Sequence, residues 1–199
     1  MNTTYNLSAR KMIDPVMDEA TMVRLSQNGD HDMFVCLYDA YLERVYRYVN
    51  CRVGDEHLAE DITSQVFLKA WENLGTYQAG QSPFMAWLYR IAHNAVIDYY
   101  RAKKITFSFE EINLGKLSHT DEVEEKLDKQ FQSQKLREAL QTLTDEQQQV
   151  LILKFVGGLS TEEIAQQLGK HQGAIRALQM RGLQGLAKVP ELQREQLYG

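Results

Sequence analysis

Apolar side chains recur at steps of three and four along most of this chain, which is the period of an amphipathic α-helix. Helices are predicted over residues 22–27, from Asp32 to about Val53 and from Glu56 to Leu74. The second is rich in aromatic residues, and its predicted core side carries Phe34, Leu37, Tyr38, Tyr41, Leu42, Val45, Tyr46 and Val49. No window alternates as a β-strand bounded by hairpin turns does. We therefore predict an all-α protein.

A predicted helix from Pro83 to Arg101 has two contrasting faces. Ser82 is placed to act as its N-cap, and Pro83 suits the first helical position, where its missing N–H is not needed. One face is apolar and consists of Leu88, Ile91, Ala92, Ala95 and Tyr99. The other face, here called the polar stripe, is predicted to be exposed and consists of Trp87, Arg90, Asn94, Asp98 and Arg101.

The polar stripe combines an aromatic ring with fixed cations and short polar groups. Aromatic faces beside cations can hold the unstacked bases of a single nucleic-acid strand. The stripe is equally compatible with an ordinary solvated helix face, on which Asp98 and Arg101 form an i, i+3 pair. The helix alone does not decide between these two interpretations.

The helical pattern fails from Ile105 to about Ser133. Acidic residues gather here among Gly, Ser, His and Thr, so we interpret residues 105–134 as a linker. The linker separates two small predicted helical domains. The expected organisation is a lead-in over 1–21, a first domain over 22–104, the linker, a second domain over 135–190 and a tail over 191–199.

Two capping boxes predict helix starts in the second domain. Thr144 with Gln147 opens a helix that is expected to run to Val156. Ser160 with Glu163 opens a shorter one. In a capping box the side chain of each partner satisfies a backbone N–H that the first helical turn leaves free. These starts are therefore local signals that do not depend on the rest of the fold.

The short helix over 161–168 is expected to end at Gly169, and a longer helix follows from about Gln172 to Lys188. A short helix, a tight glycine turn and a longer basic helix are typical of a helix-turn-helix. The alternative is a helical packing unit with a basic solvated face. Because the capping boxes and Gly169 fall where the motif needs them, we favour DNA binding.

The second helix of this motif has a predicted outward face. Gln172 and Arg176 lie near its start, where side chains reach base edges in the major groove. Arg181 is better placed for a phosphate, which fixes register without reading sequence. Gln179 lies nearer the buried flank, so it is a weaker candidate.

The formal net charge of −5 is unevenly distributed. Residues 105–134 hold three basic and seven acidic side chains, whereas residues 135–199 hold eight basic and seven acidic ones. Cations gather without intervening acids in two places, Arg101, Lys103 and Lys104 in the first domain and Lys170, Arg176, Arg181 and Lys188 in the second. Local stripes of cations guide nucleic-acid binding more than the total charge does.

Several classes of protein are disfavoured. The longest apolar run of the second half, residues 150–153, is cut by Lys154, so no membrane insertion is predicted. The polar N-terminus lacks the order of a signal peptide, which favours the cytoplasm. No convergent nucleophile, base or metal set is found, so we predict no enzyme and no cofactor.

The cysteines are predicted to be buried thiols, because both lie in apolar helical surroundings. The histidines are scattered along the chain without a metal-ligand spacing. A metal site is conceivable but disfavoured; its ligands would be His31, Cys36, Cys51 and His57.

Two parts of the chain resemble regions 2 and 4 of the bacterial sigma-70 family. The first resemblance rests on Ala-Glu-Asp-Ile-Thr at 59–63, Val-Phe-Leu-Lys-Ala-Trp at 66–71, Trp-Leu-Tyr-Arg-Ile-Ala at 87–92, Asn94 and Asp-Tyr-Tyr-Arg at 98–101. The second rests on Leu-Gln-Thr-Leu at 140–143, Glu-Ile-Ala at 163–165, Leu-Gly at 168–169, Ala-Ile at 174–175 and Arg181. Two such regions joined by a short linker resemble the extracytoplasmic-function (ECF) group.

The resemblance implies an RNA polymerase sigma factor that confers promoter specificity and has no enzymatic activity of its own. Its implied partners are core RNA polymerase and promoter DNA. An anti-sigma factor is a common further partner in the group, although no residue proves one here. The alternative is a helix-turn-helix transcriptional regulator that does not engage polymerase, which would leave the polar stripe without a role.

The resemblance also implies three sets of site residues. Polymerase binding would fall to Asp61, Ser64, Gln65 and Lys69. The loop Leu74–Pro83 would take a flipped base of the −10 element, and the melted strand would contact Tyr77, Phe84, Trp87, Arg90, Asn94, Asp98, Arg101, Lys103 and Lys104. The −35 element would be read by Lys170, His171, Gln172, Arg176, Gln179 and Arg181.

The chain departs from the family pattern at two places. Ser64-Gln65 stand where the family usually has Gln-Glu, which weakens the expected polymerase contact. His171 occupies the place of a frequent Ser or Thr cap, so the cap of the last helix is expected to be weaker or supplied by another group.

Overall fold

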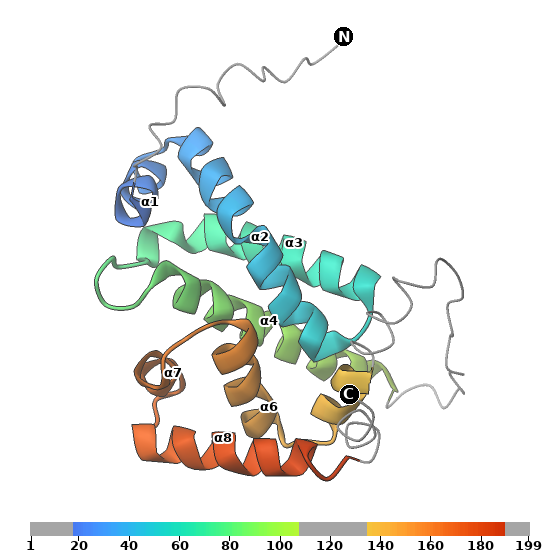
Figure 1. The fold of residues 1–199 in the computed structure, drawn as a ribbon. Coiled ribbons are helices and arrows are strands. Elements are labelled where there is room, and N and C mark those ends of the chain that lie inside the picture. The colour runs from blue at the N-terminus through green and yellow to red at the C-terminus, as the bar shows by residue number, and fades with distance from the viewer. Residues whose placement is uncertain (1–17, 108–134, 190–199) are drawn as a thin grey trace, which may run out of the picture.

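The computed structural model describes residues 18–107 and 135–189, and within these ranges it contains helices and no strand, as predicted. The N-terminal unit consists of α1 (Glu19–Gln27), α2 (His31–Val53), α3 (Glu56–Asn73), a 3₁₀ turn (Leu74–Thr76) and α4 (Phe84–Phe107). The C-terminal unit consists of helical residues 135–141, α6 (Asp145–Leu151), a π-helical turn (Ile152–Val156), α7 (Thr161–Leu168) and α8 (Gln172–Leu186). Figure 1 shows the C-terminal unit packed beneath α2 and α4.

Short acidic side chains begin the first three helices. Asp18, Asp30 and Asp55 each accept a hydrogen bond from the backbone N–H three residues later, at 2.7, 3.2 and 2.8 Å. Each bond satisfies an amide that the helix leaves free. Gly54 ends α2 with a φ of +75°, a backbone conformation that glycine adopts without strain. The break predicted between the second and third helices is thereby confirmed.

The core of the N-terminal unit lies where α2, α3 and α4 meet. Its side chains come from all three helices and include Val45, Val49, Ile62, Val66, Leu88 and Ala92, all at most 1% exposed. Aromatic rings close its edges, because Tyr38 packs against Phe67 and Tyr48 against Tyr89. Helices α2 and α3 therefore hold α4 in a fixed position.

The C-terminal unit is a helix-turn-helix. Both predicted capping boxes are formed, Thr144 with Gln147 and Ser160 with Glu163. Gly169 ends α7 with a φ of +61°. Where α8 crosses α6, a Cβ on Gly182 would come within 2.9 Å of the Leu151 side chain, so glycine permits the close approach. The motif therefore has the local signals that the sequence predicted.

Some predicted helix boundaries are wrong. The first helix begins at Glu19 rather than residue 22, because Asp18 caps it. The fourth begins at Phe84, so Ser82 is not its N-cap; the Pro83 carbonyl accepts the Trp87 N–H at 3.2 Å. It also continues to Phe107, past the predicted start of the linker.

Two boundaries in the C-terminal unit also differ from prediction. The helix expected to run to Val156 is α-helical only to Leu151 and then widens into the π-helical turn. The last helix ends at Leu186, two residues earlier than predicted. Helix termini fray, so the second difference has little structural consequence. The π-helical turn after Leu151 is a change of backbone geometry.

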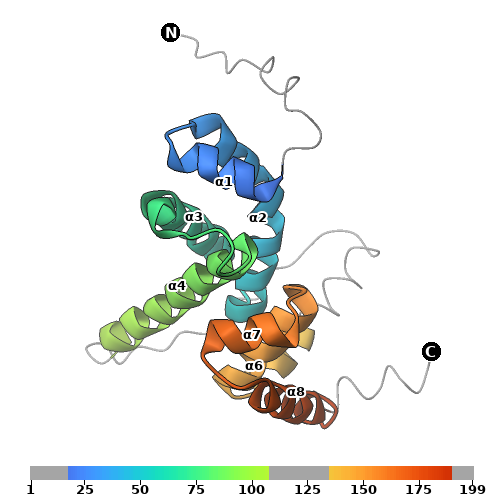
Figure 2. The same ribbon diagram turned by 90° about the vertical axis from the view of Figure 1, so that its left-hand side faces the viewer.

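The two units contact each other through α4 with α7 and through α2 with the π-helical turn. Figure 2 shows the same relation from the side, with α7 next to α4. Polar groups also cross this boundary. Arg52 of α2 pairs with Asp145 of α6, and the Arg44 guanidinium donates to the Gly157 carbonyl at 3.3 Å.

Candidate nucleic-acid interface

The loop between α3 and α4 is held by two side chains of α1. The Gln27 amide donates to the carbonyls of Leu74 and Tyr77, at 2.9 and 2.8 Å. The Glu19 carboxylate accepts from the Phe84 N–H at 3.3 Å and from the Tyr41 hydroxyl. Helix α1 therefore fixes both the loop and the first turn of α4. Nothing in the hydrophobic pattern had indicated this role.

Three aromatic rings form a cluster at the start of α4. Tyr77 packs against Phe84 and Trp87, with ring centroids 5.2 and 5.4 Å apart, and Phe84 stacks on Trp87 at 5.4 Å. All three are buried, and Trp87 is only 6% exposed. The prediction that Trp87 forms an exposed aromatic of the polar stripe is therefore wrong. Burying so large a ring against two others is favourable and outweighs the helical spacing that placed it on the polar face.

The other members of the polar stripe behave as predicted. Arg90, Asn94, Asp98 and Arg101 are exposed, and the apolar face opposite them is buried or partly buried. Lys103, one turn beyond Tyr99, lies over the Tyr99 ring at 5.8 Å. The Lys104 side chain lies outside the described residues, although its backbone belongs to α4.

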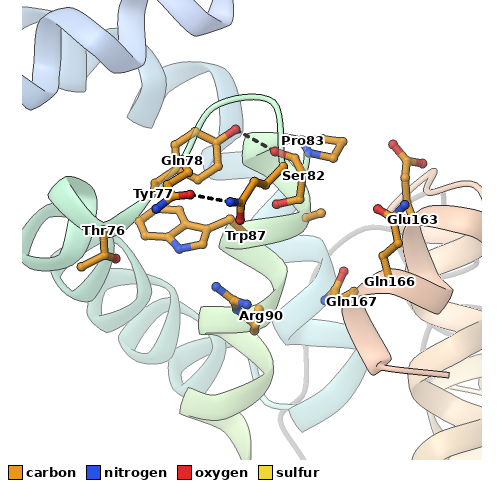
Figure 3. Close-up of a pocket in the computed structure, with 12 residues that line it drawn as sticks. Thr76, Tyr77, Gln78, Ser82, Pro83, Trp87, Arg90, Glu163, Gln166 and Gln167 are labelled. Atoms are coloured by element: carbon orange, nitrogen blue, oxygen red, sulfur yellow. Dashed lines mark hydrogen bonds between the residues drawn. The ribbon is translucent and has the colours of Figure 1, made fainter.

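A pocket of roughly 320 Å³ opens beside the aromatic cluster. The N-terminal unit contributes the loop and the first turns of α4 to its walls, and α7 of the C-terminal unit forms the opposite wall, as Figure 3 shows. The Tyr77 hydroxyl donates to the Ser82 carbonyl at 2.8 Å and closes the loop on itself. The lining residues are Thr76, Tyr77, Gln78, Gln81, Ser82, Pro83, Ala86, Trp87, Arg90, Glu163, Gln166 and Gln167.

A second pocket, of roughly 330 Å³, lies between α3 and α4 and shares Trp87 and Arg90 with the first. Its other walls include Asn73, Asn94 and Ile91. Lys69 of α3 lies here, 3.7 Å from the Asp98 carboxylate. The two pockets are neighbours along α4, because Thr76, Trp87 and Arg90 line both, and we call this polar surface with its aromatic residues and cations the groove. Such a surface suits an unstacked nucleic-acid strand.

The last helix presents its predicted outward face to solvent. Gln172, Arg176 and Arg181 are exposed, and Gln179 is partly buried as expected. The Arg176 guanidinium donates to the Gln172 amide oxygen at 3.4 Å, so these two side chains lie together near the helix start. His171 stands at the N-cap and makes no side-chain capping bond, as predicted. Lys170 pairs with Glu146 of α6 at 2.8 Å.

Comparison with known proteins decides the family. Residues 37–105 match Sigma-70 region 2, and residues 133–186 match Sigma-70 region 4. The chain is 36% identical over 179 residues to the ECF RNA polymerase sigma factor BldN of Streptomyces coelicolor, covering 86% of this chain and 67% of BldN. This protein belongs to the ECF sigma factors of the sigma-70 family.

A second relative agrees with this assignment, and a solved structure has the same fold. The sigma factor is 36% identical over 136 residues to the RNA polymerase sigma factor YlaC of Bacillus subtilis, covering 67% of this chain and 78% of YlaC. The solved sigma factor RpoE of Bartonella quintana, in complex with the anti-sigma factor NepR, has a TM-score of 0.65, 21% identity and coverage of 79% of this chain and 96% of RpoE. The predicted family, fold class and RNA polymerase sigma factor function are confirmed. The helix-turn-helix regulator is not favoured.

The predicted polymerase-binding residues of the sigma factor lie along one face of α3. Asp61, Ser64 and Gln65 are exposed there. Leu68 lies on the same face with its side chain 58% exposed, and sequence reasoning missed it. The signal was present, because Leu68 is four residues from Ser64 and out of phase with the buried positions. Lys69 differs from the other three, since it lies at the edge nearest α4.

Sequence reasoning also missed the contribution of α7 to the first pocket. The sequence had indicated Glu163 as a capping residue and as part of the region 4 motif, and it had not indicated Gln166 or Gln167. Their position depends on how one unit packs on the other, and no local pattern in the sequence indicates that packing. The pocket next to the aromatic cluster is therefore a feature of the assembled chain.

The other sequence predictions are tested in part. Cys36 and Cys51 are free thiols, but both are partly rather than fully buried. In the described residues, no group of three or more His, Cys, Asp or Glu side chains is placed to hold a metal ion. None of the helices in the same ranges is both long enough and apolar enough to cross a bilayer.

Proposed function

We propose that this sigma factor directs core RNA polymerase to promoters by capturing the −10 strand along α4 and reading the −35 duplex with α8. The observation that carries the proposal is the groove along α4, in which Trp87 and Arg90 stand between two pockets. A flipped base costs a few kcal/mol of stacking, and an aromatic pocket with hydrogen-bonding walls offsets it. Tyr77 and Phe84 act there by fixing the Trp87 ring.

The −10 residues divide into two roles on this proposal. Arg90, Asn94 and Arg101 are exposed and contact the strand directly, as Lys103 and Lys104 do at the far end of α4. Asp98 sets the position of its cationic neighbours through ion pairs at 3.6 and 3.7 Å. The aromatic residues Tyr77, Phe84 and Trp87 support the pocket wall.

For the −35 element we propose that Gln172 and Arg176 read base edges. The exposure of both side chains at the start of α8 supports this role. Arg181, Lys170 and His171 contact phosphates, and Gln179 contributes least because it is partly buried. The helix boundaries of the helix-turn-helix support the same orientation, in which the first turn of α8 enters the major groove of the DNA.

For polymerase binding we propose the α3 face formed by Asp61, Ser64, Gln65 and Leu68, with Lys69 at its edge. An exposed leucine among polar groups gives such a surface an apolar anchor. We also propose that the domains divide at 22–104 and 135–190 around the linker. The factor acts in the cytoplasm without enzymatic activity of its own. An anti-sigma factor is proposed as a further partner, because the solved RpoE was bound to one.

Run-off transcription with core polymerase and a matched promoter tests the central proposal. The Asn94→Ala variant should lower open-complex yield about tenfold while keeping its affinity for core polymerase. His57→Ala is the control, since its imidazole is 91% exposed at the start of α3 and lies outside both pockets. Equal open-complex yields from parent and Asn94→Ala would refute strand capture by this groove. Asp61→Arg should abolish co-purification with core polymerase, and retained binding would remove the α3 assignment.

A further inference from the structure

Helix α8 turns one row of residues away from the rest of the C-terminal unit. The row, here called the outer row, is exposed and consists of Gly173, Arg176, Ala177 and Met180. Positions i, i+3, i+4 and i+7 share one face of a helix, and the buried Ile175 and Leu178 lie on the opposite face. Figures 1 and 2 show α8 along the side of the C-terminal unit that lies away from α4. The outer row is therefore open to a DNA duplex.

Three members of the outer row carry no strong hydrogen-bonding group in their side chains, and Arg176 is the exception. Ala177 ends in a methyl group and Met180 in a thioether with a terminal methyl group. Such side chains do not read the hydrogen-bond donors and acceptors of base edges. The one apolar group that a base presents in the major groove is the C5-methyl of thymine. Contact with that methyl group is therefore the base readout open to Ala177 and Met180.

The length of the outer row fits the major groove. From Gly173 to Met180 the helix advances about 11 Å, at about 1.5 Å per residue. The major groove of B-DNA is about 12 Å wide. Recognition helices place side chains from successive turns of one face on base edges. Ala177 and Met180 therefore lie over bases when Arg176 does.

The glycine of the outer row is not required by packing among the described residues. A Cβ on Gly173 would have no neighbour within 4 Å, whereas a Cβ on Gly182 or Gly185 of the same helix would lie 2.9 or 2.6 Å from a leucine side chain. Glycine favours a helix less than alanine does, so Gly173 brings the fold no gain. A missing side chain on this face lets the helix backbone approach another molecule closely. The short side chain of Ala177 needs such an approach to touch a base.

Met180 has the longest apolar side chain of the outer row, and it is 63% exposed. Single exposed apolar residues are common on protein surfaces, so exposure alone does not mark a binding residue. The position of Met180 is more informative, because it lies one turn beyond Arg176 on the same face. The flexible and polarisable thioether adapts its shape to the group that it contacts. Arg181 lies at the edge of this face and supplies the phosphate contact proposed above.

We propose that Ala177 and Met180 select thymine in the −35 element by contacting its C5-methyl group, and that Gly173 lets α8 lie close enough for both contacts. Arg176 reads a neighbouring base through hydrogen bonds. The element therefore combines a position read by hydrogen bonds with positions read by methyl contact. This inference rests on the proposed role of α8 at the −35 element and names the base that its apolar residues select.

Replacing thymine by deoxyuridine tests methyl readout directly, because deoxyuridine lacks only the C5-methyl group. Holoenzyme first selects its −35 element from promoter duplexes that are randomised over that region. Its affinity is then measured for duplexes in which each thymine of either strand is replaced in turn. At one or two positions the replacement should weaken binding about three- to fivefold, the effect of losing the burial of a single methyl group. Equal affinity at every position, or a selected element without A·T pairs, would overturn the proposal.

Variants of Met180 assign one methyl contact to a side chain. Met180→Gln has a similar length but a polar end, so at one position the ratio of the affinities for thymine and deoxyuridine duplexes should fall to about one. Met180→Leu should keep the ratio, because leucine is apolar. The ratio is taken within one variant, so a change in folding stability affects both duplexes alike and cancels. A ratio that Met180→Gln retains at every position would overturn the assignment to Met180.

Leu183→Gln is the matched control, since Leu183 is an exposed apolar residue of α8 outside the outer row. It should leave the ratio unchanged. Loss of the ratio in this control as well would show that any polar substitution on α8 has the same effect, which would also overturn the assignment. Affinity for core polymerase should be equal in parent and Met180→Gln. Weaker polymerase binding with an unchanged ratio would make Met180 a protein contact instead.

Gly173→Ala tests the close approach. Alanine favours a helix more than glycine does, so the urea midpoint of unfolding should not fall. Affinity of holoenzyme for the selected duplex should fall, because the added methyl group holds the helix away from the bases. Unchanged or tighter binding would overturn the role given to Gly173.

Arg176→Ala separates a failure of this inference from a failure of the proposed function. If Arg176→Ala loses discrimination within the −35 element while deoxyuridine has no effect on the parent, α8 reads the element without methyl contacts and only this inference is wrong. If neither Arg176→Ala nor Met180→Gln changes binding to the selected duplex, α8 does not read the −35 element. The proposed function of α8 then fails together with the inference.

Discussion

Lys69 of α3 and Asp98 of α4 face each other across the groove, with the Lys69 ammonium 3.7 Å from the Asp98 carboxylate. Arg101 approaches the same carboxylate from the next turn, at 3.6 Å. All three side chains are at least 44% exposed, so these ion pairs contribute little to folding, about 0–1 kcal/mol. On the proposed function, their arrangement determines how much positive charge the groove offers to a strand.

The first prediction concerns this carboxylate. Asp98→Asn should remove a negative charge beside the strand and free Lys69 to bind a phosphate in addition to Arg101, so holoenzyme should bind single-stranded promoter DNA more tightly at low salt. The salt dependence should steepen, by about 0.7 in log–log slope for each additional phosphate that a cation neutralises. Fluorescence anisotropy over a range of salt concentrations measures both quantities. An unchanged slope would show that Lys69 does not reach the strand.

The second prediction concerns the buried Trp87. Trp87→Ala should lower the free energy of unfolding by about 3–5 kcal/mol, because it removes a ring packed between two others. Asn94→Ala should change it by less than about 0.5 kcal/mol, since that side chain is exposed. Urea unfolding followed by circular dichroism separates the two. A loss of transcription in Trp87→Ala can be assigned to strand binding only after its free energy of unfolding has been measured. A Trp87→Ala protein as stable as the parent would contradict the packing role.

The third prediction concerns pH. Burial, reinforced by the nearby Arg52 cation, lowers the pKa of His93 below its usual value, although Asp145 acts in the opposite direction. At pH 7.5 the imidazole is mostly uncharged in both the folded and the unfolded chain. As the pH falls below about 6.5, the unfolded chain takes up a proton before the folded one, so stability is lost until the folded pKa is passed.

His93→Gln should flatten this dependence. Urea unfolding of the full chain at pH 7.5 and pH 5.5 measures it, and the parent should lose more stability between the two values than the variant. Arg52 and Asp145 are the charged groups that act on the His93 imidazole. An equal loss in parent and variant would assign the acid sensitivity to another group.

The fourth prediction separates base reading from phosphate contact in α8. Arg176→Ala should reduce discrimination at one position of the −35 element by about 1–3 kcal/mol. Arg181→Ala should weaken binding to all sequences alike and reduce the salt slope by about 0.9. Competition binding of holoenzyme to −35 variants at several salt concentrations distinguishes them. If both variants lost affinity uniformly, Arg176 would be a phosphate contact as well.

Local signals explain which features could be predicted from the sequence. The capping boxes at Thr144 and Ser160 and the glycine at 169 act within one helical turn, and all three are formed as expected. The burial of Trp87 was mispredicted, because helical spacing assigns it to the polar face while two other rings cover it. The docking of α7 on α4 depends on contacts between separate units and left no periodic pattern to read.

The bonds from Gln27 connect the first described helix to a loop 47 and 50 residues further along the chain. The shape of that loop is thus a joint property of two segments that a comparison of loop sequences would treat separately. Two sigma factors with the same residues from 74 to 83 but different first helices can present the loop differently to the same base. If the loop contacts a base as proposed, exchanging it between relatives should transfer base preference only when the residue at position 27 is exchanged with it.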